Sequence, residues 1–153
     1  KKRFQIAFEK GDKEIIRLLL GSEDNEKFAY LNTDFSFSSD LIKMDIPSFV
    51  ETIKTNSFMH CENLTEVNIP KSVTSIEDEA FIGCISLQYI TIPDSVTHIG
   101  NFVFNECKSL KRINLPTSLE FIGEGTFQKC SSIEQISIPS SLKTIENGMF
   151  VKC

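Results

Sequence analysis

Long apolar runs are missing from this sequence, and so is any strong excess of basic residues. No apolar stretch approaches the ~20 residues that a membrane-spanning helix needs, so membrane insertion is not expected. The formal net charge is -5 at pH 7, whereas nucleic-acid binding usually requires a basic surface. The basic residues 1–3 precede an apolar stretch that Glu9 and Lys10 interrupt, which makes a poor signal peptide. The sequence therefore predicts neither a nucleic-acid-binding protein nor a membrane protein.

Every proline and every cysteine in the chain follows one 23-residue period. The prolines are Pro47, Pro70, Pro93, Pro116 and Pro139, the cysteines are Cys61, Cys84, Cys107, Cys130 and Cys153, and a matching phenylalanine column is Phe58, Phe81, Phe104, Phe127 and Phe150. Chance does not place two complete residue types on one register. A fixed period of this length indicates a solenoid, in which each coil stacks on the next. We therefore expect five coils over residues 41–153.

Within each coil, the apolar pattern predicts a short strand and a tight turn. Residues 64–70 end in an apolar/polar alternation, which is typical of a strand with one buried face, and proline ends the strand because it has no N–H. Residues 72–76 are expected to form a second extended piece, and residues 77–81 a helical or 3₁₀ turn. Stacking would then give a parallel sheet with strands ~4.8 Å apart. The predicted core columns include Ile46, Ile69, Ile92, Leu115 and Ile138, and Ile53, Ile76, Ile99, Ile122 and Ile145.

The repeated string is Leu-x-x-Ile-x-Ile-Pro-x-Ser-Val-x-x-Ile-x-x-x-x-Phe-x-x-Cys. It resembles the BspA-like class of leucine-rich repeats over residues 41–153. The resemblance implies a leucine-rich-repeat solenoid, and repeats of this class often occur in surface or adhesive proteins of bacteria and parasitic protists. Many leucine-rich repeats carry a ladder of asparagines where this chain has Ser72, Ser95, Ser118 and Ser141. Their hydroxyl groups are expected to bond backbone groups at the corner of each coil. Phe49 replaces serine in the first coil, which predicts a boundary coil.

The first part of the chain follows a different pattern. Residues 7–20 predict two helices hinged at Gly11. Over residues 4–20 the chain resembles the latter half of one ankyrin repeat. A single ankyrin unit is not stable alone, so this helical pair is expected either to continue units that lie upstream or to dock on the solenoid as a cap. Residues 21–27 are polar and predict a linker.

Residues 28–40 are expected to form a degenerate coil that caps the array. Within them, Tyr30, Phe35 and Ser38 lie 23 residues before Ile53, Phe58 and Cys61. The predicted domains are thus a helical segment and linker at 1–27, a capping coil at 28–40, and a solenoid at 41–153. The fold class expected from the sequence is an α+β repeat, with five 23-residue coils, a parallel β-sheet and an N-terminal helical cap.

Catalytic and metal-binding groups form no recognisable arrangement in this repeat. His60 and His98 occupy different coil positions, and the repeat places no Ser or Cys nucleophile beside either one. The acidic residues 77–79 occur together in one coil only, which is typical of a solvated turn rather than a calcium site. The 7 glycines are scattered and form no phosphate-binding loop. The sequence therefore predicts no enzyme, no cofactor and no metal site.

The cysteines are predicted to be reduced thiols in a core column. Zinc motifs need cysteine pairs two to four residues apart, and a 23-residue spacing offers none. Stacked parallel side chains also keep their Cβ atoms farther apart than a relaxed disulfide allows. Because a buried free cysteine behaves as a small apolar residue, all five are expected to react slowly in the native chain.

Two columns point outward between the core positions of the first strand. They are Lys43, Glu66, Tyr89, Arg112 and Gln135, and Asp45, Asn68, Thr91, Asn114 and Ser137. The core columns repeat almost unchanged, whereas these two vary in charge, size and hydrogen bonding. Tyr and Arg are favoured anchors of protein interfaces, and Tyr89 and Arg112 fall on adjacent coils. We therefore predict that these ten residues bind a partner. The alternative is an ordinary polar surface.

The function that the sequence favours is a protein-interaction scaffold. The sequence does not identify the partner protein. The resemblance adds a surface or adhesive role. Two alternatives remain open, an intracellular adaptor that combines ankyrin-like helices with the solenoid, and a structural fragment that self-associates. Free cysteines and the missing signal peptide favour the cytoplasm, whereas the resemblance favours the cell surface.

The last coil is expected to differ from the others. Residues 133–153 are predicted to leave strand groups unpaired and to present an apolar end, which a repeat array normally closes with a polar cap. The residues of this end are Ile136, Ile138, Leu142, Ile145 and Phe150. End-to-end self-association through residues 133–153, or fraying there, is expected, with further repeats in a longer gene.

Overall fold

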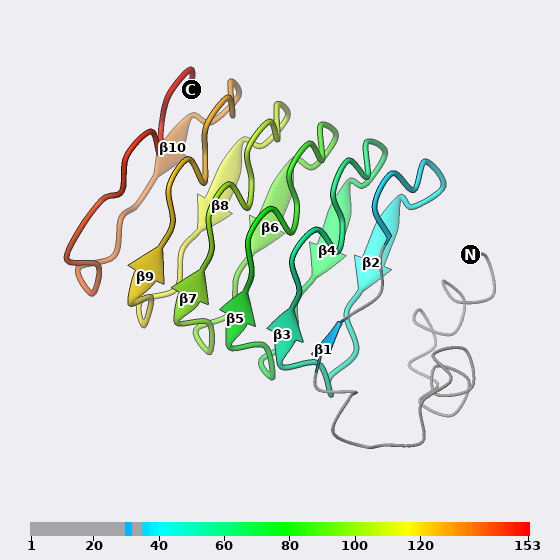
Figure 1. Ribbon diagram of the computed structural model, residues 1–153, viewed down its shortest axis with the longest axis horizontal. Helices are drawn as coiled ribbons and strands as arrows, with labels where there is room; N and C mark the ends of the chain where they lie inside the picture. The colour runs from blue at the N-terminus through cyan, green and yellow to red at the C-terminus, as the bar shows by residue number, and fades with distance from the viewer. Residues whose placement is uncertain (1–29, 32–34) are drawn as a thin grey trace.

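The computed structural model describes residues 30–31 and 35–153 and shows a β-solenoid built from two parallel sheets (Figure 1). The sheet with the order β2-β4-β6-β8-β10 is called the even sheet, and the sheet with the order β1-β3-β5-β7-β9 the odd sheet. Their strands are β1 (Tyr30–Leu31), β2 (Lys43–Asp45), β3 (Thr52–Ile53), β4 (Glu66–Asn68), β5 (Ser75–Ile76), β6 (Tyr89–Thr91), β7 (His98–Ile99), β8 (Arg112–Asn114), β9 (Phe121–Ile122) and β10 (Gln135–Ile136).

The register of both sheets follows the 23-residue period. In the even sheet Lys43 pairs with Glu66, and in the odd sheet Thr52 pairs with Ser75. Each of the first four coils gives one strand to each sheet, so the predicted second extended piece is confirmed there. The fifth coil gives β10 to the even sheet and no strand to the odd sheet. Figure 1 shows the coils in regular succession from β2 to β10, with the even and odd strands on opposite layers.

No helix occurs among the described residues, so these form a solenoid of strands and turns, and the α+β class is not supported. The ankyrin-like helical pair and cap predicted at residues 4–20 lie outside the described residues. The helical turn predicted at 77–81 is instead part of a run of turns over residues 78–83. Glu79 has a φ of 58°, in the left-handed region, where a right-handed helix cannot continue. The backbone N–H of Phe81 bonds to the carbonyl of Val103 in the next coil, 3.0 Å away. Hydrogen bonds between coils therefore replace those that a helix would make within a coil.

A column of stacked phenylalanine rings forms the centre of the core. Phe58, Phe81, Phe104 and Phe127 are fully buried. The ring centroids of successive members are 5.0, 5.7 and 5.9 Å apart, and the ring planes are nearly parallel. Aromatic rings at this spacing gain more than the burial of their area alone. The phenylalanine column predicted from the period is confirmed.

The cysteines form a parallel column beside these rings, and none is bridged. Each thiol points at a phenylalanine carbonyl 26 residues earlier: Cys84 Sγ lies 3.1 Å from the carbonyl oxygen of Phe58. Burial raises the pKa of Cys130 to about 12 and holds the pKa of Cys107 well above its ordinary value. Cys153 is exposed, so the prediction of five buried thiols is wrong for this residue.

The serine ladder expected at the corner of each coil is present. Each hydroxyl donates to a carbonyl of the preceding coil. The bonds are Ser72 to Val50 at 2.7 Å, Ser95 to Val73 at 2.6 Å, Ser118 to Val96 at 3.4 Å, and Ser141 to Leu119 at 2.6 Å. Because these carbonyls lie 22 residues upstream, the ladder ties successive coils together.

The residues before the first coil continue the same architecture. Phe35 stacks on Phe58 with 5.4 Å between ring centroids, as their 23-residue spacing predicted. β1 pairs with β3 through Leu31 and Ile53, so Leu31 rather than Tyr30 is equivalent to Ile53. The division of the chain at residues 27 and 40 stays a prediction.

The last coil is less buried than the others. Ile138 and Ile145, which the pattern assigned to core columns, are 37% and 58% exposed. Phe150 stacks on Phe127 at 5.8 Å, yet remains 36% exposed. Ile136 and Leu142 are half-buried. These side chains form the apolar end that the sequence predicted.

Candidate partner-binding face

The outward face of the even sheet comes from simple strand alternation. In β2, β4, β6 and β8 the middle residue is buried and both flanking residues are exposed, because successive side chains of a strand point to opposite faces. The buried positions include Val67 and Ile90, which are each 4% exposed. All ten residues predicted to bind a partner are exposed, namely Lys43, Asp45, Glu66, Asn68, Tyr89, Thr91, Arg112, Asn114, Gln135 and Ser137.

The pairing of the strands brings these residues together in two lines across the sheet. Tyr89 pairs with Arg112, and Arg112 with Gln135. Thr91 pairs with Asn68 on one side and with Asn114 on the other. Ser137 follows the last residue of β10. The structure therefore assembles one continuous face from residues 43 to 137, as a surface for a large partner requires.

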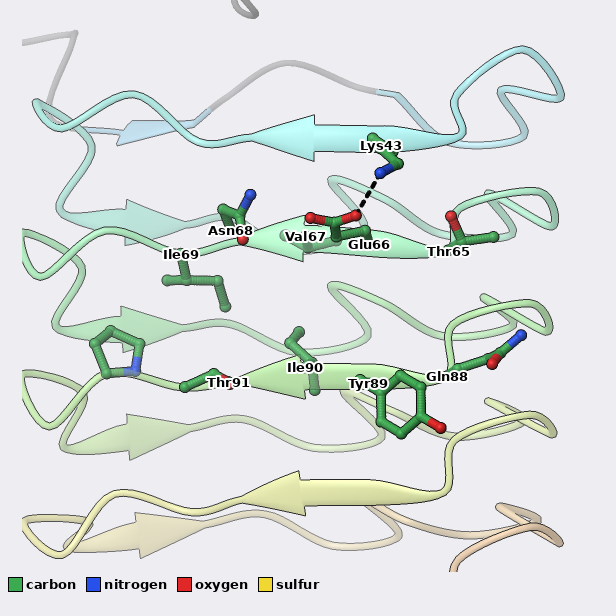
Figure 2. A pocket seen from close by; sticks show the side chains of 11 residues that line it. Lys43, Thr65, Glu66, Val67, Asn68, Ile69, Gln88, Tyr89, Ile90 and Thr91 are labelled. Carbon is green, nitrogen blue, oxygen red and sulfur yellow. Dashed lines mark ion pairs between the residues drawn. The ribbon is translucent and has the colours of Figure 1, made fainter.

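The exposed charges at the β2 end of this face already have partners within the sheet. Lys43 Nζ lies 2.7 Å from Glu66 Oε2, and the hydrogen bond that Lys43 donates to this carboxylate raises the pKa of Lys43 (Figure 2). Asn68 Nδ2 donates to Asp45 Oδ1 at 2.5 Å. Exposed pairs of this kind contribute little to stability. The Lys43–Glu66 pair is neutral as a whole, whereas Asp45 keeps its negative charge because its partner is an uncharged amide.

The middle of the face is different, because its large side chains lack such partners. Tyr89 is 55% exposed. Arg112, on the neighbouring strand, is also exposed and makes no ion pair with any described residue. Tyr and Arg are both among the residue types that are enriched at the hot spots of protein interfaces.

A depression of about 680 Å³ lies between β4 and β6. Tyr89 stands at the start of β6, and Ile69 lies beyond the end of β4 on the opposite side of the depression (Figure 2). β4 and β6 are in register through Asn68 and Thr91 alone, whereas β2–β4 and β6–β8 each pair through three residues. The depression therefore lies where two neighbouring strands of the even sheet share the fewest paired residues.

A second depression, of about 610 Å³, adjoins the first at the corner of the coils. Ile69, Thr91 and Pro93 line both, and Leu115 and Lys71 line the second only. The sequence did not predict this corner as a site, because the pattern placed Ile69 and Leu115 in the core. Both are only half-buried, whereas Ile46 and Ile92 at the same register position are buried.

An aromatic pair on the odd sheet was also missed. The rings of His98 and Phe121 stack with 4.6 Å between their centroids, and Phe121 is 37% exposed. The sequence position of Phe121 could have predicted its exposure. Phe121 directly precedes the buried Ile122, and successive side chains of a strand point to opposite faces, so the phenylalanine points outward.

Neither histidine belongs to a metal-binding cluster. His60 stacks with Phe37 at 5.2 Å, and His98 with Phe121. Within residues 30–31 and 35–153, no group of three or more His, Cys, Asp and Glu side chains could hold a metal ion. In the same residues we find no helix that is long and apolar enough to cross a bilayer.

Comparison with known sequences gives one clear relationship. The family model described as BspA type leucine-rich repeat region matches residues 31–153 in six copies. A comparison with curated proteins gave no significant match.

Solved structures agree with this match. A leucine-rich repeat protein from T. pallidum is 33% identical with a TM-score of 0.76, over 78% of this chain and 56% of its own. A leucine-rich cell surface protein from Faecalibacterium prausnitzii is 31% identical with a TM-score of 0.58, over 61% of this chain and 25% of its own. A leucine-rich repeat protein from Bacteroides ovatus is 32% identical with a TM-score of 0.56, over 74% and 35%. This chain thus spans little more than half of the first of these proteins.

Proposed function

Because this chain belongs to the BspA-type leucine-rich repeat family, we propose that it is a protein-binding scaffold that presents the outward face of the even sheet to a macromolecular partner. Leucine-rich repeats are typical of protein-binding scaffolds and of bacterial surface proteins, and the family is a non-enzymatic one. One observation carries the proposal: the buried columns are nearly identical from coil to coil, while the exposed columns of the even strands vary. Folding requires buried columns that repeat, and recognition of one particular partner requires exposed columns that vary.

The ten outward residues from Lys43 to Ser137 form the proposed surface, with Tyr89 and Arg112 as its anchors. The exposed ring of Tyr89 offers apolar area, and the guanidinium group of Arg112 offers donors that no described residue uses in an ion pair. Lys43 and Glu66 form an ion pair with each other and lie in the polar rim of the proposed surface.

We place this function at a cell surface. The support is the name of the F. prausnitzii relative, a leucine-rich cell surface protein that is 31% identical to this chain. The buried thiols are compatible with this location, because burial and a high pKa protect them from oxidation. An intracellular adaptor is the alternative, and detection of an epitope-tagged chain on intact cells, without permeabilisation, separates the two.

Self-association is the second candidate function. The exposed side chains of Ile138, Ile145 and Phe150 in the fifth coil support it, because a second copy could cover this apolar end. Light scattering of the isolated chain at increasing concentration tests the idea. Replacement of Ile145 by Lys should then abolish any dimer that forms.

The test of the binding face is site-specific photocrosslinking. A benzophenone amino acid is introduced in place of Tyr89 on the even sheet or, as the matched control, in place of Phe121 on the odd sheet. Both positions carry an exposed aromatic ring, so the substitutions are equally conservative. With a partner recovered by affinity capture on the unmodified chain, the crosslink should form from position 89 and not from position 121. The reverse result would contradict the proposal.

A further inference from the structure

The residues that lead into the strands of the even sheet differ in charge from coil to coil. Residues 108–112, which lead into β8, contain three cations and no acid. The corresponding residues 62–66 before β4 contain two acids, residues 85–89 before β6 have no charged side chain, and residues 131–135 before β10 contain one acid. Positive charge is therefore concentrated at the start of one strand, in a chain whose net charge is -5.

The three cations at the start of β8, called the basic cluster, are available to a ligand. Lys108, Lys111 and Arg112 are exposed, and none of them makes an ion pair with another described residue. The pKa of Glu106 is lowered chiefly by a hydrogen bond from Lys129, at 2.5 Å, and further by the positive charge of Lys108. Glu106 is thus neutralised by Lys129, and the charge of Lys108 stays unbalanced.

The neighbouring coils balance only part of this charge. Glu134 lies at the register position of Lys111 in the next coil, and its backbone N–H donates to the carbonyl of Lys111 at 3.3 Å. The exposed carboxylate of Glu134 balances one of the three cations, so the basic cluster keeps two positive charges in excess. On the other side, Gln88 and Tyr89 carry no charge, and Figure 2 shows both side chains at the start of β6.

The acids on either side of the basic cluster limit the size of an anionic ligand. Glu134 lies one strand away, and Glu62, at the register position of Lys108, lies two strands away in the other direction. Two strand spacings are roughly 10 Å, which is about the distance over which charges interact in physiological salt. A nucleic acid or a planar anionic membrane would meet these acids as well, whereas a short acidic segment contacts the basic cluster alone.

We propose that the basic cluster binds a short acidic segment of the partner protein. This inference rests on the proposed function, because it names the part of the partner that the even sheet recognises. A carboxylate of the segment accepts two parallel N–H bonds from the guanidinium group of Arg112, and others face the ammonium groups of Lys108 and Lys111. Lys108 and Lys111 thereby extend the partner-binding surface beyond the ten outward strand residues.

The test uses fluorescein-labelled hexaglutamate as the probe and hexaglutamine as its uncharged control. The full chain should bind hexaglutamate and not hexaglutamine, and increasing salt should weaken the complex. The double variant Lys108→Glu with Lys111→Glu should raise the dissociation constant roughly tenfold or more. The matched control is Lys71→Glu with Lys143→Glu, which makes the same change of net charge at two exposed lysines outside the basic cluster. It should raise the constant less than about threefold.

Other outcomes overturn the inference, and they separate it from the proposed function. No binding of hexaglutamate, equal binding of hexaglutamine, or equal losses in the two double variants would each contradict recognition by the basic cluster. Tighter binding of short single-stranded DNA or of phosphatidylserine vesicles would assign the cluster to another class of ligand. With the captured partner, a loss of affinity in Tyr89→Ala but not in Lys108→Glu with Lys111→Glu overturns the inference alone. If neither change affects that affinity, the proposed function fails as well.

Discussion

Phe104 lies in the middle of the stacked rings, and Phe102, two residues earlier, lies outside the stack. Phe104 is fully buried between Phe81 and Phe127, so Phe104→Ala should leave a cavity and lower the free energy of unfolding by roughly 3–5 kcal/mol. Phe102 is half-buried, and its Ala variant should lose only roughly 1–2 kcal/mol. Urea unfolding of the two variants measures the difference. Equal losses would contradict the assignment of the core.

The thiols differ in exposure, and their reactivity should differ in the same way. Cys61, Cys84, Cys107 and Cys130 are buried, and Cys153 is exposed. A thiol reagent at neutral pH should therefore modify one thiol quickly in the native chain and all five after denaturation, without a reductant. Mass spectrometry of the modified chain identifies the fast residue. Fewer than five reactive thiols after denaturation would show a bridge.

The buried thiols also predict a dependence of stability on alkaline pH. Burial raises the pKa of Cys107 well above the ordinary value of 9.0 and that of Cys130 to about 12. Above pH 9 the unfolded chain releases thiol protons that the folded chain keeps, so the folded state is fully favoured below pH 9 and loses stability as pH rises toward 12. The urea midpoint of the unmodified chain should fall over this range. Cys107→Ala should show a shallower fall, and an identical slope would contradict the burial of that thiol.

At the scale of the turn, two glycines provide a matched comparison. Gly83 and Gly148 have φ values of +70° and +69°, so alanine at either position should cost roughly 1–2 kcal/mol of backbone strain. A Cβ at Gly83 would also lie 2.2 Å from Nδ1 of His60, whereas the nearest atom at Gly148 is 4.0 Å away, on Val151. Gly83→Ala should therefore lower the melting temperature further than Gly148→Ala.

The contact of Gly83 with His60 can be tested in the background of a second change. His60 stacks with Phe37, so its ring has little freedom to move away. In a His60→Ala chain, Gly83→Ala should cost no more than Gly148→Ala does. A difference that persisted in this background would assign the extra loss to something other than the His60 ring.

The coils should also differ in their protection. Coils two to four carry strands in both sheets, while the fifth has β10 alone, and its Ile145 is 58% exposed. With fewer strand hydrogen bonds and more exposed side chains, residues 133–153 should exchange their amide hydrogens faster than residues 64–130. Hydrogen exchange with mass spectrometry resolves the two regions. Uniform protection through Cys153 would show that the fifth coil is as stable as the others.

At the scale of the whole molecule, repetition explains both what the sequence could predict and what it could not. The columns of Phe104 and Cys107 recur in every coil and the serine ladder in all but the first, so the pattern of one coil predicts the stacking of the others. Glu79 and Phe102 adopt a positive φ without being glycine, but they occupy the same register position as Gly125, which also has a positive φ. The glycine in that later coil was the available signal for the turn that replaces a helix. In this turn the backbone N–H groups of Glu79 and Phe102 donate to carbonyls of the next coil.

The candidate site was likewise predicted from the sequence only in part. Alternation within each strand predicted correctly that Tyr89 and Arg112 are exposed. The exposed corner was missed, because Ile69 and Leu115 are apolar and occupy the same register position as Ile46 and Ile92, which are buried. A repeating pattern predicts the same burial for every coil, so it could not predict this difference between coils.

The central claim is that the even sheet, and not the odd sheet, is the surface that binds a partner. Each sheet has one exposed aromatic residue beside one exposed nitrogen-bearing side chain on adjacent strands, Tyr89 with Arg112 and Phe121 with His98. The decisive measurement is the affinity of the captured partner for two double variants, Tyr89→Ala with Arg112→Ala and His98→Ala with Phe121→Ala. The first should weaken binding roughly a hundredfold, because two anchors of an interface are lost, and the second should leave it unchanged. Loss of binding in the second variant alone would contradict the claim.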